Sequence, residues 1–133
     1  MTLQEKFQQA VKMDLASLIK TLQVTPELAQ ETDDNGCSLL FFACARSDYE
    51  KIIVLLGDTK DPNQPNNYGV YPIEAFVNAA NAGVKTADNY TDLILQILLE
   101  SGVKPTQKAI NRAVSLDRPD LAAQMTAKMQ PKI

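Results

Sequence analysis

The spacing of the apolar residues predicts that most of this chain is helical. Near the N-terminus, apolar residues recur at three- and four-residue steps, as one face of an α-helix requires. A polar break at Met13-Asp14 divides this stretch into two short antiparallel helices. Thr25-Pro26-Glu27 then predicts a helical turn, with the threonine as its N-cap and the proline at its first helical position. The apolar face of the first stretch consists of Phe7, Ala10, Val11, Leu15, Leu18, Ile19 and Leu22.

A tight turn and two further helices follow. Asp33-Asp34-Asn35-Gly36 predicts a turn, because Asn and Gly tolerate the positive φ angles that tight turns need. Ser38 opens a short, densely apolar helix, which Arg46-Ser47-Asp48 ends. A second helix comes next, and residues 57–67, rich in Pro, Asn and Asp, form an extended loop that cannot contribute to a core. The buried stripe of the second helix is expected to consist of Ile52, Ile53, Leu55 and Leu56.

The opening of this unit recurs further along the chain. Gly36-Cys-Ser-Leu-Leu-Phe-Phe-Ala-Cys is followed by Gly69-Val-Tyr-Pro-Ile-Glu-Ala-Phe-Val, and the two glycines lie 33 residues apart, the repeat length of the ankyrin family. An ankyrin repeat opens with a glycine in a turn, followed by Thr-Pro-Leu-His, two alanines and a second helix with a leucine stripe. Ser38 and Tyr71 stand in place of the threonine, and a second helix resumes at Thr91. The chain therefore resembles the ankyrin-repeat family.

Two features depart from that pattern. Phe41 and Glu74 occupy the position of the usual histidine, so the hydrogen bond by which that histidine braces the turn is absent or replaced. The second repeat also carries about ten extra residues, 80–89, between its helices. This insertion is either a tolerated surface loop or a second contact site, for which Lys85 and Tyr90 are the candidates.

The resemblance implies an all-α ankyrin-repeat solenoid of about four stacked antiparallel helix pairs with finger-like turns. Residues 1–133 would form a single domain. Atypical ends shield the stacked core of such a protein from water, so the first and last helix pairs are interpreted as caps. The expected division is an N-terminal capping pair at 1–33, a repeat at 34–66, a repeat with the insertion at 67–105 and a C-terminal cap at 106–133.

Composition and charge narrow the range of partners. The apolar fraction, 45%, is enough for a sizeable core, and the net charge of −3 argues against a general nucleic-acid binder, which would normally be basic. Residues 27–61 hold eight acidic against three basic residues, whereas residues 101–133 hold six basic against two acidic ones. This asymmetry reflects either two solvated faces or complementary steering of a partner.

The residues that usually carry chemistry are scarce. The chain has no histidine, which removes the commonest general base and metal ligand, and Cys37 and Cys44 alone cannot complete a zinc site. The aspartates lack the spacing of an EF-hand, and there is no glycine-rich phosphate loop or nucleophile elbow. We therefore expect no catalysis, no metal and no cofactor.

The expected location is the cytoplasm. Two free thiols suit a reducing compartment, and the N-terminus lacks the apolar stretch of a signal peptide. No segment is long enough to span a bilayer, so no membrane association is expected. Secretion without a cleaved signal remains an alternative.

The resemblance also implies where a partner would bind. In this family the contact residues lie on the finger tips and on the outward edge of the first helix of each repeat. Tyr68 is the most promising anchor, because a tyrosine combines a large contact area with a low entropy cost, and Arg46 is the next. Each position has the alternative of being an ordinary solvated residue. The candidates are Asp34, Asn35, Cys37, Phe41, Ala45, Arg46, Asn67, Tyr68, Val70, Glu74 and Asn78.

Two functions follow from these expectations. The first is a module, monomeric by itself, that binds another protein through its concave finger and inner-helix surface as an adaptor, inhibitor or regulator. The alternative is a host-directed or toxin-neutralising factor that blocks an enzyme's active site, with the acidic residues of 27–61 in place of an anionic substrate.

Overall fold

The protein is all-α. The computed structural model describes residues 2–80 and 90–129, and within them it contains eight α-helices, one 3₁₀ helix and no strand. An isolated backbone bridge joins Thr32 to Ser38. No helix in these two ranges is long and apolar enough to cross a membrane. The helices are α1 (Leu3–Lys12), α2 (Leu15–Val24), the 3₁₀ helix η1 (Pro26–Gln30), α3 (Leu39–Ala45), α4 (Tyr49–Asp58), α5 (Pro72–Ala80), α6 (Tyr90–Glu100), α7 (Gln107–Ser115) and α8 (Pro119–Met129).

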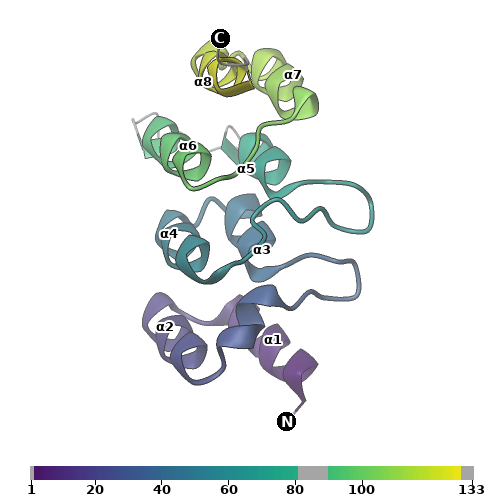
Figure 1. Cartoon of the computed structure of the whole chain (residues 1–133), viewed down its shortest axis with the longest axis vertical. Coiled ribbons are helices and arrows are strands. Elements are labelled where there is room, and N and C mark those ends of the chain that lie inside the picture. Colours follow the sequence, from purple (N-terminus) through teal and green to yellow (C-terminus); the bar gives the residue numbers. More distant parts are fainter. Residues whose placement is uncertain (1, 81–89, 130–133) are drawn as a thin grey trace.

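The helices form two rows along the long axis of the molecule (Figure 1). One row consists of α1, α3, α5 and α7, in which each helix packs against the next. The other row consists of α2, α4, α6 and α8, which also pack in succession. The first and last helices, α1 and α8, lie at opposite ends, and the long loops before α3 and α5 project beside the first row (Figure 1).

Side-chain caps determine where most of these helices begin. The carboxylate of Asp14 accepts a hydrogen bond from the Ser17 amide, which explains the break predicted at Met13-Asp14. Ser38, which was expected to open this helix, is the N-cap of α3, and its hydroxyl accepts a hydrogen bond from the Phe41 amide. The predicted turn at Thr25 is present as η1, but the Thr25 hydroxyl makes no capping hydrogen bond, so the predicted N-cap was wrong in that detail.

The connection between paired helices is built in the same way in two places. Ser47, between α3 and α4, and Asp117, between α7 and α8, both adopt positive φ angles, 54° and 62°. In each case the amide of the following residue donates to the carbonyl of an alanine in the preceding helix, Ala43 at 3.0 Å or Ala113 at 2.8 Å. Both alanines are buried, and their small side chains allow close packing of the neighbouring helices.

The core is one continuous apolar cluster that includes residues from both rows. Most of the predicted core positions are buried, among them Phe7, Leu18 and Leu55. Ile53, which we expected in the stripe of the second helix, is 49% exposed, and Ile19 also lies at the surface. Ile53 directly follows Ile52 and lies two residues before Leu55, so it does not share the buried face of α4 and its place in the stripe was wrong. Ile19 lies three residues before the buried Leu22, and there the period alone does not show the exposure.

Two boundaries differ from the sequence-based expectation. Helix α4 continues to Asp58, so Gly57 and Asp58 belong to a helix and not to the extended loop predicted at 57–67. The insertion predicted at 80–89 lies, apart from Ala80, outside the described residues.

Candidate functional site

The loop before α3 is a tight turn held by one carboxylate. The Asp33 Oδ1 atom accepts hydrogen bonds from the amides of Asn35 and Cys37, each at 2.9 Å. The Gly36 amide donates to the Asp33 carbonyl at 3.0 Å, and Gly36 itself has a φ of +80°. Glycine adopts this left-handed conformation without the steric cost that a Cβ atom brings, so the turn predicted from Asn35-Gly36 is confirmed.

The loop before α5 repeats this arrangement 33 residues later. The Asn66 Oδ1 atom accepts hydrogen bonds from the amides of Tyr68 at 2.9 Å and Val70 at 3.0 Å. The Gly69 amide donates to the Asn66 carbonyl at 3.0 Å, and Gly69 has a φ of +77°. Asn66 was not among the predicted residues, although its position 33 residues after Asp33 was the signal that would have identified it.

The two turns are joined to each other at their tips. The Asn67 amide donates to the Asn35 carbonyl at 2.8 Å, and the Asn67 side-chain amide donates to the Asp34 carbonyl at 3.0 Å. The Tyr68 hydroxyl reaches the Asn35 side chain at 3.5 Å, yet Tyr68 remains 73% exposed. Asp34, Asn35, Asn67 and Tyr68, all exposed, are called the tip row below.

A groove lies between α5 and α7, and Val70, from the loop before α5, belongs to its lining. Val70, Glu74 and Asn78 line one wall, and Lys108 and Arg112 line the other; we call it the α5–α7 groove. The Arg112 Nε atom donates a hydrogen bond to the Asn78 Oδ1 atom at 2.7 Å. Three predicted contact residues therefore meet in one place. Lys108 and Arg112 were not predicted as contact residues; the available signal was their four-residue spacing on a helix.

Two predicted contact residues, Cys37 and Glu74, are buried, and the exposed position expected for Cys37 was wrong. Cys37 is 8% exposed, its sulfur accepts a hydrogen bond from Asn66 at 3.6 Å, and burial raises the pKa of its thiol. Glu74 is 7% exposed. Its carboxylate accepts hydrogen bonds from the Tyr71 amide at 3.2 Å and from the Thr106 hydroxyl at 2.7 Å. Glu74 therefore braces the start of α5 and joins it to the start of α7.

The remaining predicted residues lie on or beside α3. Ala45 and Arg46 are exposed, and Phe41 is half-buried. The Arg46 guanidinium donates to the Val11 carbonyl at 3.1 Å and lies over the Phe42 ring, 5.5 Å from its centroid. Arg46 therefore joins α3 to α1, and a partner would have to compete with these internal contacts.

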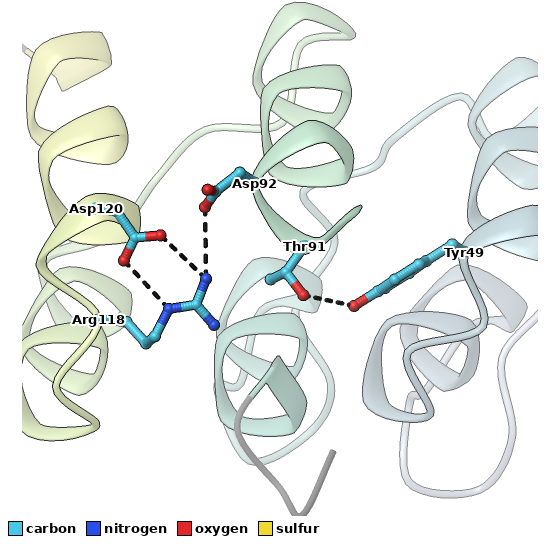
Figure 2. Close-up of polar contacts among 5 residues, drawn as sticks. All are labelled: Tyr49, Thr91, Asp92, Arg118 and Asp120. Atoms are coloured by element: carbon cyan, nitrogen blue, oxygen red, sulfur yellow. Dashed lines mark hydrogen bonds and ion pairs between the residues drawn. The ribbon is translucent and has the colours of Figure 1, made fainter. Parts of the chain in front are cut away.

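A separate polar cluster connects the helices of the other row (Figure 2). The hydroxyl groups of Tyr49 and the buried Thr91 are 2.8 Å apart, which joins α4 to α6. Arg118 contacts Asp92 at 3.5 Å and holds Asp120 through two hydrogen bonds of 3.1 and 3.0 Å. The hydrogen bonds from Arg118 lower the pKa of Asp120 to about 2. The cluster holds successive helices together.

The described residues contain no group of three or more His, Cys, Asp or Glu side chains that could hold a metal ion. The two cysteines are free, and each is buried.

No protein-family model, curated protein or solved structure matches this chain.

Proposed function

We propose that this chain is an ankyrin-repeat solenoid that binds another protein through the tip row and the adjoining inner-helix surface. It acts as an adaptor, inhibitor or regulator of that partner. The observation that carries the proposal is the tip row itself: two turns with the same hydrogen bonds, 33 residues apart, joined to each other by hydrogen bonds among their four exposed tip residues. A surface that is ordered before binding loses little conformational entropy when a partner docks.

The repetition of the fold supports the same proposal. Two turns are alike in their hydrogen bonds, two helix connections are alike in theirs, and the helices pack in succession along both rows. Stacked helix pairs with projecting turns provide an extended surface, and such proteins use this surface for recognition. A partner covering the tip row and the inner helices would bury an area of up to about 800 Å² on this side, typical of standard complexes.

The alternative, in which the acidic residues of 27–61 mimic an anionic substrate, has weaker support. Asp33 accepts two amide hydrogen bonds within its turn, and Asp48 caps α4 and pairs with Lys51 at 3.5 Å. These two of the eight carboxylates stabilise the fold, which leaves fewer of them to imitate the charges of a substrate.

Affinity capture from a lysate of the source cells tests the proposal. The unmodified chain is compared with a Tyr68→Ala, Asn67→Ala variant, which removes the two side chains of the second tip. A Val24→Ala variant is the control, because Val24 is 83% exposed but lies at the end of α2, away from the tips. A protein retained by the unmodified chain and the control but lost by the tip variant supports the proposal. A captured protein that binds all three chains equally contradicts it.

A further inference from the structure

The α5–α7 groove presents two cations that the fold does not neutralise. Lys108 and Arg112 are both exposed, and in the described parts of the chain neither forms an ion pair. Arg118, in contrast, contacts both Asp92 and Asp120. The two groove cations therefore keep their positive charge available to a ligand.

Arg112 is also held in a defined orientation. Its Nε atom donates to the Asn78 side chain at 2.7 Å, which connects α7 to α5 across the groove. This contact uses one of the guanidinium's donors, and the forked end formed by its two terminal nitrogens remains for a ligand. Such a fork matches the two oxygens of a carboxylate, and holding it in advance reduces the entropy lost on binding.

Among the residues that the structure describes, Glu74 is the only acidic side chain that lines the groove. It is buried, and its two carboxylate oxygens already accept hydrogen bonds from the Tyr71 amide and the Thr106 hydroxyl. The groove thus holds two exposed cations against one buried, hydrogen-bonded carboxylate, and its outer part is positive.

We infer that the α5–α7 groove binds an acidic, extended segment of the partner protein, with its carboxylates on Lys108 and Arg112. This inference rests on the proposed function and adds the chemistry of the partner. Residues four apart on a helix surface lie about 6 Å from each other. Alternate residues of an extended chain lie about 7 Å apart on one side, so two acidic residues separated by one residue match the two cations.

Two other occupants are less well matched. Nucleic acid would place phosphates on the same cations, but the net charge of the chain is −3 and Glu74 lies inside the groove. A second copy of this chain would bring its acidic residues of 27–61 to the groove. Both occupants give results in the experiment below that differ from those of an acidic partner.

The test is a titration of the ¹⁵N-labelled full chain, followed by amide chemical shifts, with a short peptide of alternating Glu and Ser. A Lys108→Ala, Arg112→Ala variant removes both groove cations. A Lys12→Ala, Lys20→Ala variant is the matched control, since it loses the same charge from exposed positions of α1 and α2. The spectrum of each variant reports at the same time whether it is folded.

We expect saturable shifts confined to the residues lining the groove in the unmodified chain. The groove variant should lose affinity by about tenfold or more, since it gives up two contacts between charged groups, while the control should keep its affinity. Arg112→Lys, which keeps the charge but loses the fork, should fall between them. The position of the shifts in the unmodified chain tests the inference even if the groove variant fails to fold.

Several results would overturn the inference. Equal loss of affinity in both double variants would show that the peptide is held only by general charge attraction. Chemical-shift changes outside the groove would place the binding site elsewhere. Equally tight binding of a single-stranded oligothymidylate would identify the groove as a phosphate site. Groove shifts that grow with protein concentration, without any peptide, would identify a second copy as the occupant.

The two proposals fail in different ways. If the affinity-captured partner is lost by the tip variant but retained by the groove variant, the proposed function stands and the acidic segment is rejected. If the captured partner binds both variants as well as the unmodified chain, the proposed function itself is rejected.

Discussion

Replacing Gly36 by alanine tests whether the contact between the two turns stabilises this fold. An alanine at this position would have a φ of +80° and would place its Cβ atom 2.5 Å from the Asn67 side-chain oxygen and 2.9 Å from the Asn67 amide nitrogen. Real Cβ atoms do not make contacts this short with backbone atoms, so the two turns must move apart. The hydrogen bonds from Asn67 to Asn35 and Asp34 would be lost with that movement.

The loss of stability expected for Gly36→Ala has two parts. The left-handed conformation costs a non-glycine residue about 1–2 kcal/mol. Each of the two lost hydrogen bonds contributes about 0.5–1.5 kcal/mol, so Gly36→Ala should lower the free energy of unfolding by about 2–5 kcal/mol. Gly69→Ala is the matched control: its φ is +77°, but a Cβ atom there would meet nothing within 4 Å. It should cost only the conformational part, about 1–2 kcal/mol.

Urea unfolding followed by circular dichroism measures both variants against the unmodified chain. The difference between the two free energies of unfolding isolates the contact between the turns, which should contribute about 1–3 kcal/mol. If the two variants lose the same stability to within about 0.5 kcal/mol, the turns do not support each other and the tip row is not a fixed surface.

Three other measurements test how the structure holds its buried and paired groups. Arg118 lowers the pKa of Asp120 to about 2 from an ordinary 3.8, so this pair stabilises the fold above pH 3.8, and its contribution is lost as the pH falls through about 2. Arg118→Gln should therefore flatten the stability–pH curve between pH 3.8 and about 2. Burial raises the pKa of Cys44 to about 12, so mass spectrometry should find Cys44 unmodified after iodoacetamide treatment of the native protein at mildly alkaline pH, and modified only after unfolding. Tyr49→Phe should cost about 1 kcal/mol in urea unfolding, because the buried Thr91 hydroxyl loses its partner, and a Tyr49→Phe, Thr91→Val double variant should cost little more.

The helical character of the chain and the position of its turns were predicted from local chemistry. The helical period and the turn residues act over a few positions, which is why the break at Met13-Asp14, the helix opened by Ser38 and the turn at Gly36 were predicted correctly. The end of α4 was placed too early, because the glycine at position 57 is tolerated within its last turn. Ile53 was placed in the stripe against the helical period: it directly follows Ile52 and lies two residues before Leu55, so it does not share their buried face.

Burial depended on neighbours that are distant in the sequence. Glu74 is buried where α7 brings the Thr106 hydroxyl to its carboxylate, from 32 residues further along the chain. The same packing brought Arg112 to Asn78, 34 residues away, and so formed the α5–α7 groove. Local sequence specifies each turn and helix, because their energies arise within a few residues; only the stacking of helices decides which side chains are covered, which carboxylates are satisfied and which cations stay exposed.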